Sequence, residues 1–220
     1  MNNAECFNKR VDSDAAFKWF LRELNVSLRL FKFKRKGQSF AREFSDSWQV
    51  INVQLSAFSQ RGEKSLTLNF GVCSKANLRF QDKDTSKPPL HYTCPMRFRI
   101  GWLIEGKDAW WAIRDESSAQ VALSETLAAV NAKGIPFLDA LTSGNQILHL
   151  YNTGKVLGFE IDRDEERLIL LAEAGAGQQI PERLREYEAR WPATGAADRA
   201  SRFLSHFKET YRTAIVCADS

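Results

Sequence analysis

An apolar–polar alternation with a period of two is the sequence feature that most constrains the fold. It runs through residues 47–57, stops at the turn-forming residues 60–63, and resumes up to residue 72. The apolar side consists of Ile51, Val53, Leu55, Leu66, Leu68, Phe70 and Val72, and the polar side of Asn52, Gln54, Ser56, Thr67 and Asn69. Strands joined by a short turn pair antiparallel, so the segment predicts a β-hairpin with one buried face and one polar face.

Segments on either side of this hairpin predict further strands. Residues 28–36 alternate up to a turn at Lys36-Gly37, and the chain returns through residues 40–44. Residues 96–104 alternate again. On the expected buried side of that last strand lie Met96, Phe98, Ile100 and Trp102. Because short turns join most of these strands, we expect an antiparallel sheet of about five strands.

Helical spacing predicts the elements outside the sheet. An N-terminal helix is expected to begin at a cap formed by Asp12-Ser13 and to end near Asn25. Residues 75–95 are expected to form a long polar loop. The later helices are expected at residues 117–132 (stopped by Gly134), 136–141, 144–151 (capped by Ser143), 162–174, 181–191 and 197–216, with a strand-like segment at 155–161.

The expected fold class is therefore α+β. An N-terminal helix packs on a roughly five-stranded antiparallel sheet, and a mainly helical C-terminal part follows. We divide the chain into an α+β domain at residues 1–154 and a helical C-terminal extension at residues 155–220 that packs on the same domain.

Six short segments in a fixed order carry a family resemblance. They are F-K-R-K-G-Q-S-F-A-R (33–42), W-Q-V-I-N-V-Q-L-S (48–56), L-N-F-G-V (68–72), R-F-R-I-G (97–101), Trp110-Trp111 and I-P-F-L-D (135–139). Together they resemble the bacterial domain-of-unknown-function family 4304 over about residues 12–150. That family has no assigned activity, so the resemblance implies a bacterial source and supports the fold but implies no function.

The composition is typical of a globular protein without a membrane segment. An apolar fraction of 44% over 220 residues can form a sizeable core, and no apolar run approaches the roughly 18 residues that span a bilayer. The first residues lack the apolar stretch of a signal peptide. The cysteines Cys6, Cys73, Cys94 and Cys217 are scattered, which fits free thiols in a reducing compartment. We therefore expect a cytoplasmic protein.

Charge is divided unevenly along the chain. Residues 1–110 carry a net charge of +8 and residues 111–220 a net charge of −4. The densest basic run consists of Arg29, Lys32, Lys34, Arg35 and Lys36. Such a run can neutralise the phosphates of a nucleic acid, although lysines on an edge strand also prevent edge-to-edge pairing of sheets. Binding of nucleic acid or a phosphate ligand through the basic half is therefore kept as an alternative function.

The polar side of the predicted sheet is the main candidate site. Its expected members are Asn52, Gln54, Ser56, Thr67, Asn69, Arg97 and Arg99, with Arg42 as a further candidate. Amides, hydroxyls and guanidinium groups together suit a carboxylate, a phosphate or a protein surface. The other interpretation is a solvated face that binds nothing, which is common in antiparallel sheets.

Two adjacent tryptophans, Trp110 and Trp111, add an aromatic candidate to this site. Neighbouring residues of an extended segment point to opposite sides, so one tryptophan is expected in the core and the other at least partly exposed. An exposed tryptophan can anchor a protein interface, and we take Trp111 as that candidate.

Patterns typical of catalysis, metal binding or cofactor binding are weak. The chain has only three histidines, and His91-x-x-Cys94 would supply two of the four ligands that zinc needs. Gly175 and Gly177 imitate a dinucleotide fingerprint, but Ile180 stands where the third glycine belongs. We therefore expect no catalytic residue, metal or cofactor.

These observations favour a non-catalytic binding or interaction protein. Its partner is expected to be another protein or a small anionic ligand, with no membrane involved, and an immunity or defence-associated protein is one specific version. Nucleic-acid binding is the first alternative, and an enzyme with an unrecognised site is the second.

Overall fold

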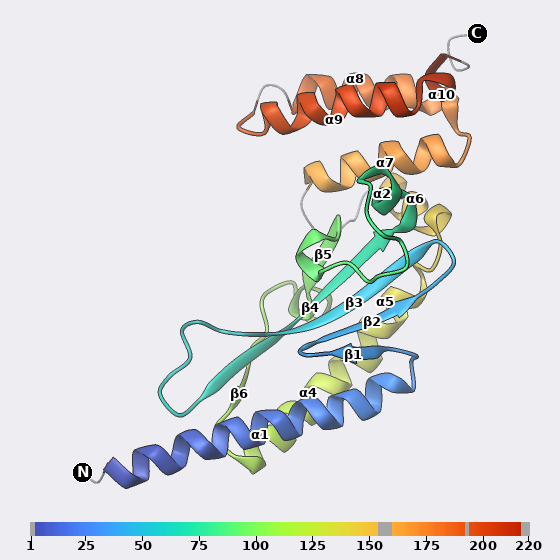
Figure 1. Cartoon of the computed structure of the whole chain (residues 1–220). Coiled ribbons are helices and arrows are strands. Elements are labelled where there is room, and N and C mark those ends of the chain that lie inside the picture. The colour runs from blue at the N-terminus through green and yellow to red at the C-terminus, as the bar shows by residue number, and fades with distance from the viewer. Residues whose placement is uncertain (1–2, 154–159, 192–193, 217–220) are drawn as a thin grey trace.

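The computed structural model describes residues 3–153, 160–191 and 194–216, with the backbone alone for residues 3–12 and 216. The helices lie around a central sheet, with α1 and α4 at one end of it and α7, α8 and α9 at the other (Figure 1). The predicted α+β class, with an N-terminal helix, an antiparallel sheet and a mainly helical C-terminal part, is confirmed. None of the described helices is both long and apolar enough to cross a membrane.

The sheet is antiparallel throughout the described chain. Its strands are β1 (Lys34–Lys36), β2 (Ser39–Glu43), β3 (Ser47–Leu55), β4 (Lys64–Ser74), β5 (Met96–Arg99) and β6 (Trp111–Ile113). They are ordered β1-β2-β3-β4-β5, and β6 pairs with the other end of β4. The predicted hairpin is the centre of this sheet, since β3 and β4 pair from Ser47 opposite Ser74 to Leu55 opposite Leu66. The predicted turn at Lys36-Gly37 is also confirmed, and Gly37 has a φ of +62°.

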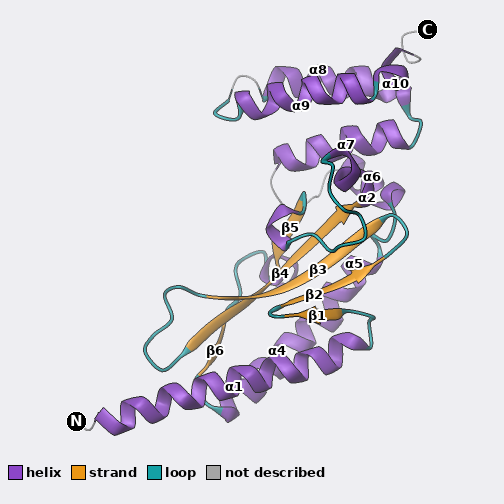
Figure 2. Ribbon diagram, in the orientation of Figure 1, coloured by secondary structure: helices purple, strands orange, loops and turns teal. Residues whose placement is uncertain are grey.

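Helices and helical turns make up most of the rest, as Figure 2 shows. They are α1 (Asn3–Arg29), α2 (Lys75–Phe80), the 3₁₀ turn η1 (His91–Thr93), α3 (Ile100–Ile104), α4 (Glu116–Ala129), the π turn η2 (Val130–Gly134), α5 (Ile135–Asp139), α6 (Gly144–Thr153), α7 (Glu160–Glu173), the 3₁₀ turn η3 (Gly177–Gln179), α8 (Ile180–Arg190), α9 (Ala197–Thr210) and α10 (Arg212–Val216).

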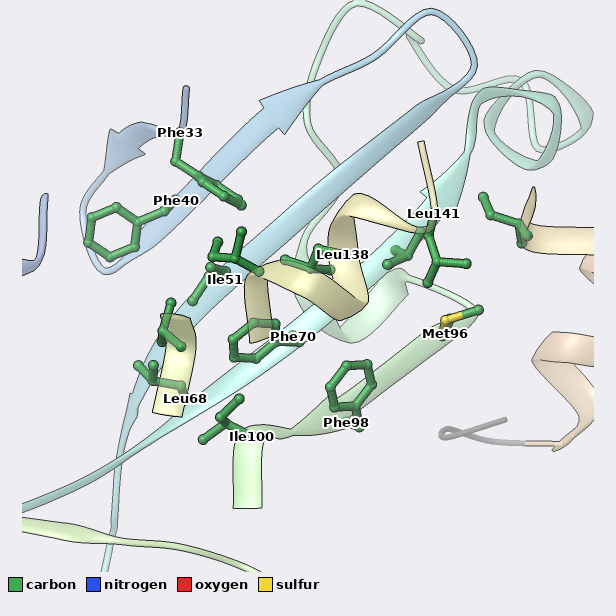
Figure 3. Close-up of a cluster of buried hydrophobic side chains, with 14 of the residues drawn as sticks. Phe33, Phe40, Ile51, Leu68, Phe70, Met96, Phe98, Ile100, Leu138 and Leu141 are labelled. Atoms are coloured by element: carbon green, nitrogen blue, oxygen red, sulfur yellow. The ribbon is translucent and has the colours of Figure 1, made fainter. Parts of the chain in front are cut away.

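The apolar side of the sheet is buried beneath α1, η2 and α5. Figure 3 shows Leu138 near Ile51 and Phe70, with Phe98 beside Phe70 and Leu141 further along the sheet. All five side chains are buried, and one continuous hydrophobic cluster joins them to residues of α1 and α4. Burial of each large apolar side chain stabilises the fold by about 1.5–3 kcal/mol, so this side of the sheet supplies much of the core.

The N-terminal helix is longer than predicted at both ends. The expected cap at Asp12-Ser13 is wrong, since the helix begins at Asn3 and Ser13 is buried within it. The expected end near Asn25 is also wrong, because Leu28 continues the apolar stripe of Leu24 one turn further and is buried. The helix ends at Arg29, and in the turn that follows Lys32 adopts a left-handed φ of +66°.

Two predicted strands are shorter than expected. Residues 28–33 belong to the end of α1 and a turn, so the strand predicted at 28–36 is reduced to β1. The strand predicted at 96–104 ends at Arg99, where α3 begins. The chain turns there because the backbone of Lys107 and Ala109 lies directly against Gly101, where a Cβ would collide. Trp102, which the alternation assigns to the buried side, is therefore half exposed.

Two other predicted elements differ in detail. The polar loop expected at 75–95 is helical at its start, as α2, and contains η1 near its end. Gly134 does not stop the preceding helix, because the backbone continues through η2 into α5 while Val130, Ile135 and Leu138 stay buried.

The C-terminal helices share the core of the sheet domain. Helix α7 contacts α2 and α6, and its buried residues Leu168, Ile169 and Leu171 belong to the same hydrophobic cluster as the sheet. Ser143 accepts a hydrogen bond from the backbone of Gln146, as expected of a helix cap. The strand-like segment predicted at 155–161 lies mostly outside the described residues, and its last two residues belong to α7.

Candidate functional site

Strand register decides which polar residues share a face. Across β2, β3, β4 and β5, Ser39 is paired with Asn52, Asn52 with Asn69, and Asn69 with Arg99. Paired residues point to the same side of a sheet, so these four side chains form one continuous row opposite the helix-covered core. Gln54, which is paired with Thr67, lies on the same side. We call Ser39, Asn52, Gln54, Asn69, Arg99 and Trp110 the polar sheet face.

Hydrogen bonds between neighbours hold this face in place. The amide of Asn52 donates to Ser39 Oγ over 2.9 Å, and the amide of Asn69 donates to Gln54 Oε1 over 2.9 Å. Asn69 is only 7% exposed, whereas Asn52 and Gln54 are partly exposed. Within the described chain, Asn52 Oδ1 and the Gln54 amide nitrogen have no hydrogen-bond partner, so both remain available to a ligand or to water.

An arginine and a tryptophan form one end of the polar sheet face. The guanidinium of Arg99 is bonded to Asp108 and lies 5.1 Å from the ring centroid of Trp110. Trp110 is 39% exposed, and continuing the pairing of β4 with β6 by one residue places it opposite Thr67. The arrangement combines a stacked cation with a wide apolar surface, both of which are enriched at protein interfaces.

One tryptophan is buried and the other is exposed, as predicted, but the exposed one is Trp110 and the choice of Trp111 as the exposed anchor is wrong. Trp111 is 9% exposed and belongs to the core, so Trp111 is not an exposed anchor. Its neighbour Trp110 lies on the polar side instead. The pairing of Trp111 with the buried Leu66 is the physical reason. Only the register of β6 decides between them.

Arg42 lies on the opposite side of the sheet, and the expectation that it joins the polar face is wrong. It is paired with Gln49, is 7% exposed, and donates to Gln49 Oε1 over 2.7 Å. It also forms an ion pair with Asp139 of α5 over 2.6 Å. Arg42 therefore fastens α5 to the sheet. Its spacing from Phe40, two residues earlier, could have shown that it points to the core side.

The remaining predicted members serve local structure. Arg97 forms an ion pair with Asp162 over 2.6 Å and donates to the carbonyl of Cys94 over 2.7 Å, so it connects β5 to α7. The hydroxyl of Ser56 accepts a hydrogen bond from the backbone of Phe58 in the hairpin turn. Thr67 is fully buried, and its hydroxyl has no hydrogen-bond partner among the residues the structure describes.

A loop covers the other end of the polar side. Residues 81–95 cross β3 and β4 there, as Figure 2 shows, and the indole of Trp48 donates to the carbonyl of Thr85 over 2.9 Å. The backbone of Gly71 lies so close to this loop that a Cβ would come within 2.8 Å of Cys94 Sγ. A small second core, which includes Trp48, Cys73 and Cys94, fills the space beneath the loop. The open part of the polar side is therefore the part around Asn52 and Gln54.

The basic run gathers at one corner of the sheet. Arg29 ends α1, Lys32 lies in the turn, and Lys34, Arg35 and Lys36 make up the edge strand β1, all of them exposed. Arg35 donates to the carbonyls of Gly37 and Leu21. The other four have no ion-pair partner among the described side chains. Phe33, which lies between Lys32 and Lys34, points into the core and is 1% exposed.

Sequence reasoning missed a buried carboxylate. Glu166 of α7 is 0% exposed and accepts hydrogen bonds from the backbone of Ser74 (2.8 Å), from the hydroxyl of Ser74 (2.7 Å) and from the hydroxyl of Tyr151. Burial raises the pKa of Glu166, and the hydrogen bonds oppose that rise. We call Glu166, Ser74 and Tyr151 the Glu166 cluster. The cluster joins α7 to the end of β4 and to α6. The sequence gives no sign of it, because Glu166 stands in the charged run of residues 162–166, which is typical of an exposed helix start.

Thiol and imidazole groups near the sheet lack the environment of a reactive site. Burial raises the pKa of both Cys73 and Cys94, and the negative charge of Glu166 raises each further, so the thiol form is favoured. Burial and the charge of Arg97 lower the pKa of His91. The part of the chain that the structure describes contains no group of three or more potential metal ligands. The side chains of Cys6 and Cys217 lie outside it.

Comparison with known proteins identifies one family. The family model described as Domain of unknown function (DUF4304) matches residues 28–140, which include β1 to β6 and extend to the end of α5. No curated protein and no solved structure matches the chain.

Proposed function

Because this chain belongs to the DUF4304 family, which has no assigned activity, we propose from its geometry alone that it is a non-catalytic binding module. Its polar sheet face contacts a partner protein. The proposal places this role in the bacterial cytoplasm, where buried free thiols such as Cys73 and Cys94 stay reduced.

One observation carries the proposal: polar and aromatic side chains from different strands stand in register on the side of the sheet that the core helices leave open. The row from Ser39 to Arg99 crosses four strands, and hydrogen bonds hold its amides before any partner arrives. Side chains that are already ordered lose little conformational entropy on binding. Arg99 and Trp110 supply the residue types that contribute most to protein interfaces.

Site-specific crosslinking tests the proposal. A photoreactive amino acid replaces Gln54 in one sample and the exposed Glu125 of α4 in the control sample, and both proteins are irradiated in the source cells. A discrete covalent adduct is expected from position 54 only. The identified partner, once purified, should bind the wild-type protein and bind Arg99→Glu at least about tenfold more weakly. The same adducts from both positions, or equal affinity for Arg99→Glu, would contradict the proposal.

An immunity role is one specific version of this function. Under that version the partner is a toxin whose active surface the polar sheet face covers, and co-expression of this protein protects cells from it. Arg99→Glu should abolish protection while expression is kept and the unfolding free energy falls by no more than about 1 kcal/mol, because the Arg99–Asp108 pair that it removes is part-exposed. If Arg99→Glu still protects the cells, the immunity role through the polar sheet face is contradicted.

The second candidate function is nucleic-acid binding through the basic corner. The observation that favours it is the exposure of all three residues of β1 together with Arg29 and Lys32. Retention on nucleic acid should fall steeply with salt, and Lys34→Gln with Lys36→Gln should lower the slope by about 0.9 for each phosphate that the variant no longer neutralises. An unchanged slope would rule out this function for the corner.

A further inference from the structure

A pocket of about 500 Å³ lies beyond the C-terminal end of β4, between α2 and the helices α7 and α9. Its volume falls within the range of about 300–1,000 Å³ that small-molecule sites occupy. One wall is formed by Asn77 to Asp82, which belong to the segment matched by the family model, and the other by C-terminal helices outside that segment. The pocket is therefore a separate site from the polar sheet face, and it depends on both parts of the chain.

The floor of the pocket is aromatic and apolar. Phe80 of α2 and Phe203 of α9 line it, with ring centroids 5.5 Å apart, together with Ile169 of α7. All three residues belong to the main hydrophobic core, which holds them in fixed positions. A flat apolar group that enters the pocket would meet ring carbons and a rigid surface.

Helix α9 supplies a wall of basic residues. Arg199, Arg202 and His206 line the pocket at spacings of three and four residues, so they lie on one face of the helix. Arg199 is neutralised by Asp162 (2.5 Å) and by Glu165. Arg202, by contrast, is exposed and has no ion-pair or hydrogen-bond partner within the described parts of the chain.

His206 stands one turn from Arg202 and is positioned by α2. Its Nε2 lies 3.1 Å from the carbonyl of Phe80, and its ring lies 4.5 Å from the ring of Phe80. A carbonyl oxygen only accepts, so Nε2–H is the donor, and Nδ1 can donate to an anion when the imidazole is doubly protonated. The two acidic residues of the lining are Glu165, which is paired with Arg199 and bonded to Tyr187, and Asp82 on the opposite wall.

We infer that this pocket binds a small organic anion that carries a carboxylate or phosphate group on a flat apolar body. Arg202, together with His206 in its doubly protonated form, holds the anionic group, and the body rests against Phe80 and Phe203. A planar guanidinium forms two parallel hydrogen bonds with either kind of oxyanion, which gives the anionic group a defined orientation.

Calorimetric titration of the full chain tests this site. The probes are phenyl phosphate and benzoate, which distinguish phosphate from carboxylate, with inorganic phosphate as the charge-only control and benzyl alcohol as the ring-only control. At least one of the two aromatic anions is expected to bind at least about tenfold more tightly than either control, because charge and apolar contact act together.

Variants locate the binding. Arg202→Ala should weaken binding of the aromatic anion by about tenfold or more. Arg202→Lys should restore part of the affinity, since lysine keeps the positive charge but cannot form the two parallel hydrogen bonds of a guanidinium. Gln81→Trp should block the exposed mouth. Arg212→Ala, which removes an exposed arginine of α10 outside the pocket, is the matched control and should leave the affinity unchanged. Equal losses for Arg202→Ala and Arg212→Ala, or no binding of either aromatic anion, would overturn the inference.

Discussion

The polar sheet face and the Glu166 cluster are both groups of polar side chains attached to β4, yet they have opposite consequences. The amides of the polar sheet face are bonded in neutral pairs, Asn52 with Ser39 and Asn69 with Gln54, and Asn52 and Gln54 keep contact with solvent. The Glu166 cluster surrounds one carboxylate with three donors in the complete absence of solvent exposure. We therefore expect the Glu166 cluster to stabilise the fold, whereas the polar sheet face stays open to solvent, as the proposed binding role requires.

The same contrast separates two arginines of the sheet. Arg42 contacts Gln49, Asp139 and the ring of Phe33, whose centroid lies 4.7 Å from the guanidinium carbon. Its charge is therefore paired within the protein. Arg99 lies at the edge of the polar side with its pair Asp108 and with Trp110. A residue type thus says little about function until its side of the sheet is known.

The largest effect on stability is expected from Glu166→Ala. The substitution removes the acceptor of three buried donors, and each buried donor that is left unsatisfied costs about 1–3 kcal/mol, so a loss of about 3 kcal/mol or more is expected. Chemical denaturation measures it. Glu209→Ala, at an exposed position of α9, is the control and should change the unfolding free energy by less than about 0.5 kcal/mol. Similar losses for both variants would mean that the cluster is not a stabilising element.

The next effect is expected at the boundary between the covered and the open part of the polar side. Gly71→Ala places a Cβ within 2.8 Å of Cys94 Sγ and should destabilise the protein by about 1–3 kcal/mol through overpacking. Cys94→Ala in the same chain removes the sulfur and should recover part of the loss. Gly195→Ala, where the Cβ would meet no atom within 4 Å, serves as the control. If Gly71→Ala unfolds at the wild-type denaturant midpoint, the loop of residues 81–95 is not packed tightly against β4 at Gly71.

A smaller, pH-dependent effect is expected from Glu166→Gln. Glutamine keeps an acceptor for Ser74 and can donate to Tyr151, so most of the hydrogen bonding survives. Because burial raises the pKa of Glu166 above its ordinary value of 4.5, the folded protein holds this proton more tightly than the unfolded chain. The stability that Glu166 contributes is therefore full below about pH 4.5 and is lost as the pH rises through the raised pKa.

The measurement is the unfolding free energy of both proteins between pH 4 and pH 8. The wild-type protein should lose stability relative to Glu166→Gln as the pH rises from about 4.5 through the raised pKa, and the difference should become constant above that pKa. A difference that does not vary with pH would show that the pKa of Glu166 is the same in the folded and unfolded states.

The smallest effect on stability is expected on the polar sheet face. Asn52→Ala removes one neutral hydrogen bond between partly exposed groups and should cost about 0.5–1 kcal/mol, whereas Gln54→Ala leaves the buried amide of Asn69 without its acceptor and should cost about 1–1.5 kcal/mol. Thermal unfolding of each variant measures this loss of stability. The free energy of partner binding should weaken by more than the unfolding free energy does. A loss near that of Glu166→Ala would mean that this face, too, serves mainly to stabilise the fold.

Local patterns predicted the fold well where the apolar and polar residues repeat regularly. The alternation around Ile51 and Leu68 located the central hairpin, and the turn at Lys36-Gly37 located the next one. The pattern failed where two periods overlap, because Leu28 fits a strand and also the helical stripe of Leu24. It also failed at Gly101, where the chain folds back so that Lys107 and Ala109 lie against this glycine and the strand ends early.

The candidate site could be predicted only in part. Asn52, Gln54 and Asn69 share a face because adjacent residues of a strand alternate, which is a local property. The place of Trp110 on that face depends on how β6 is paired with β4, and the pocket beside Arg202 depends on how α9 packs against α2. Neither can be worked out from spacing along the chain.

The sequence by itself determined the family, the α+β class and the side of each central strand that turns to the core, because periodicity and short turns act between near neighbours. Tertiary structure alone decided which polar groups are enclosed and which remain open. Glu166 is buried because α7 packs on the end of β4, and Gln54 stays open because the loop over residues 81–95 covers only the other end of the same side. Burial depends on contacts between segments far apart in the chain, and that is why it had to be seen in three dimensions.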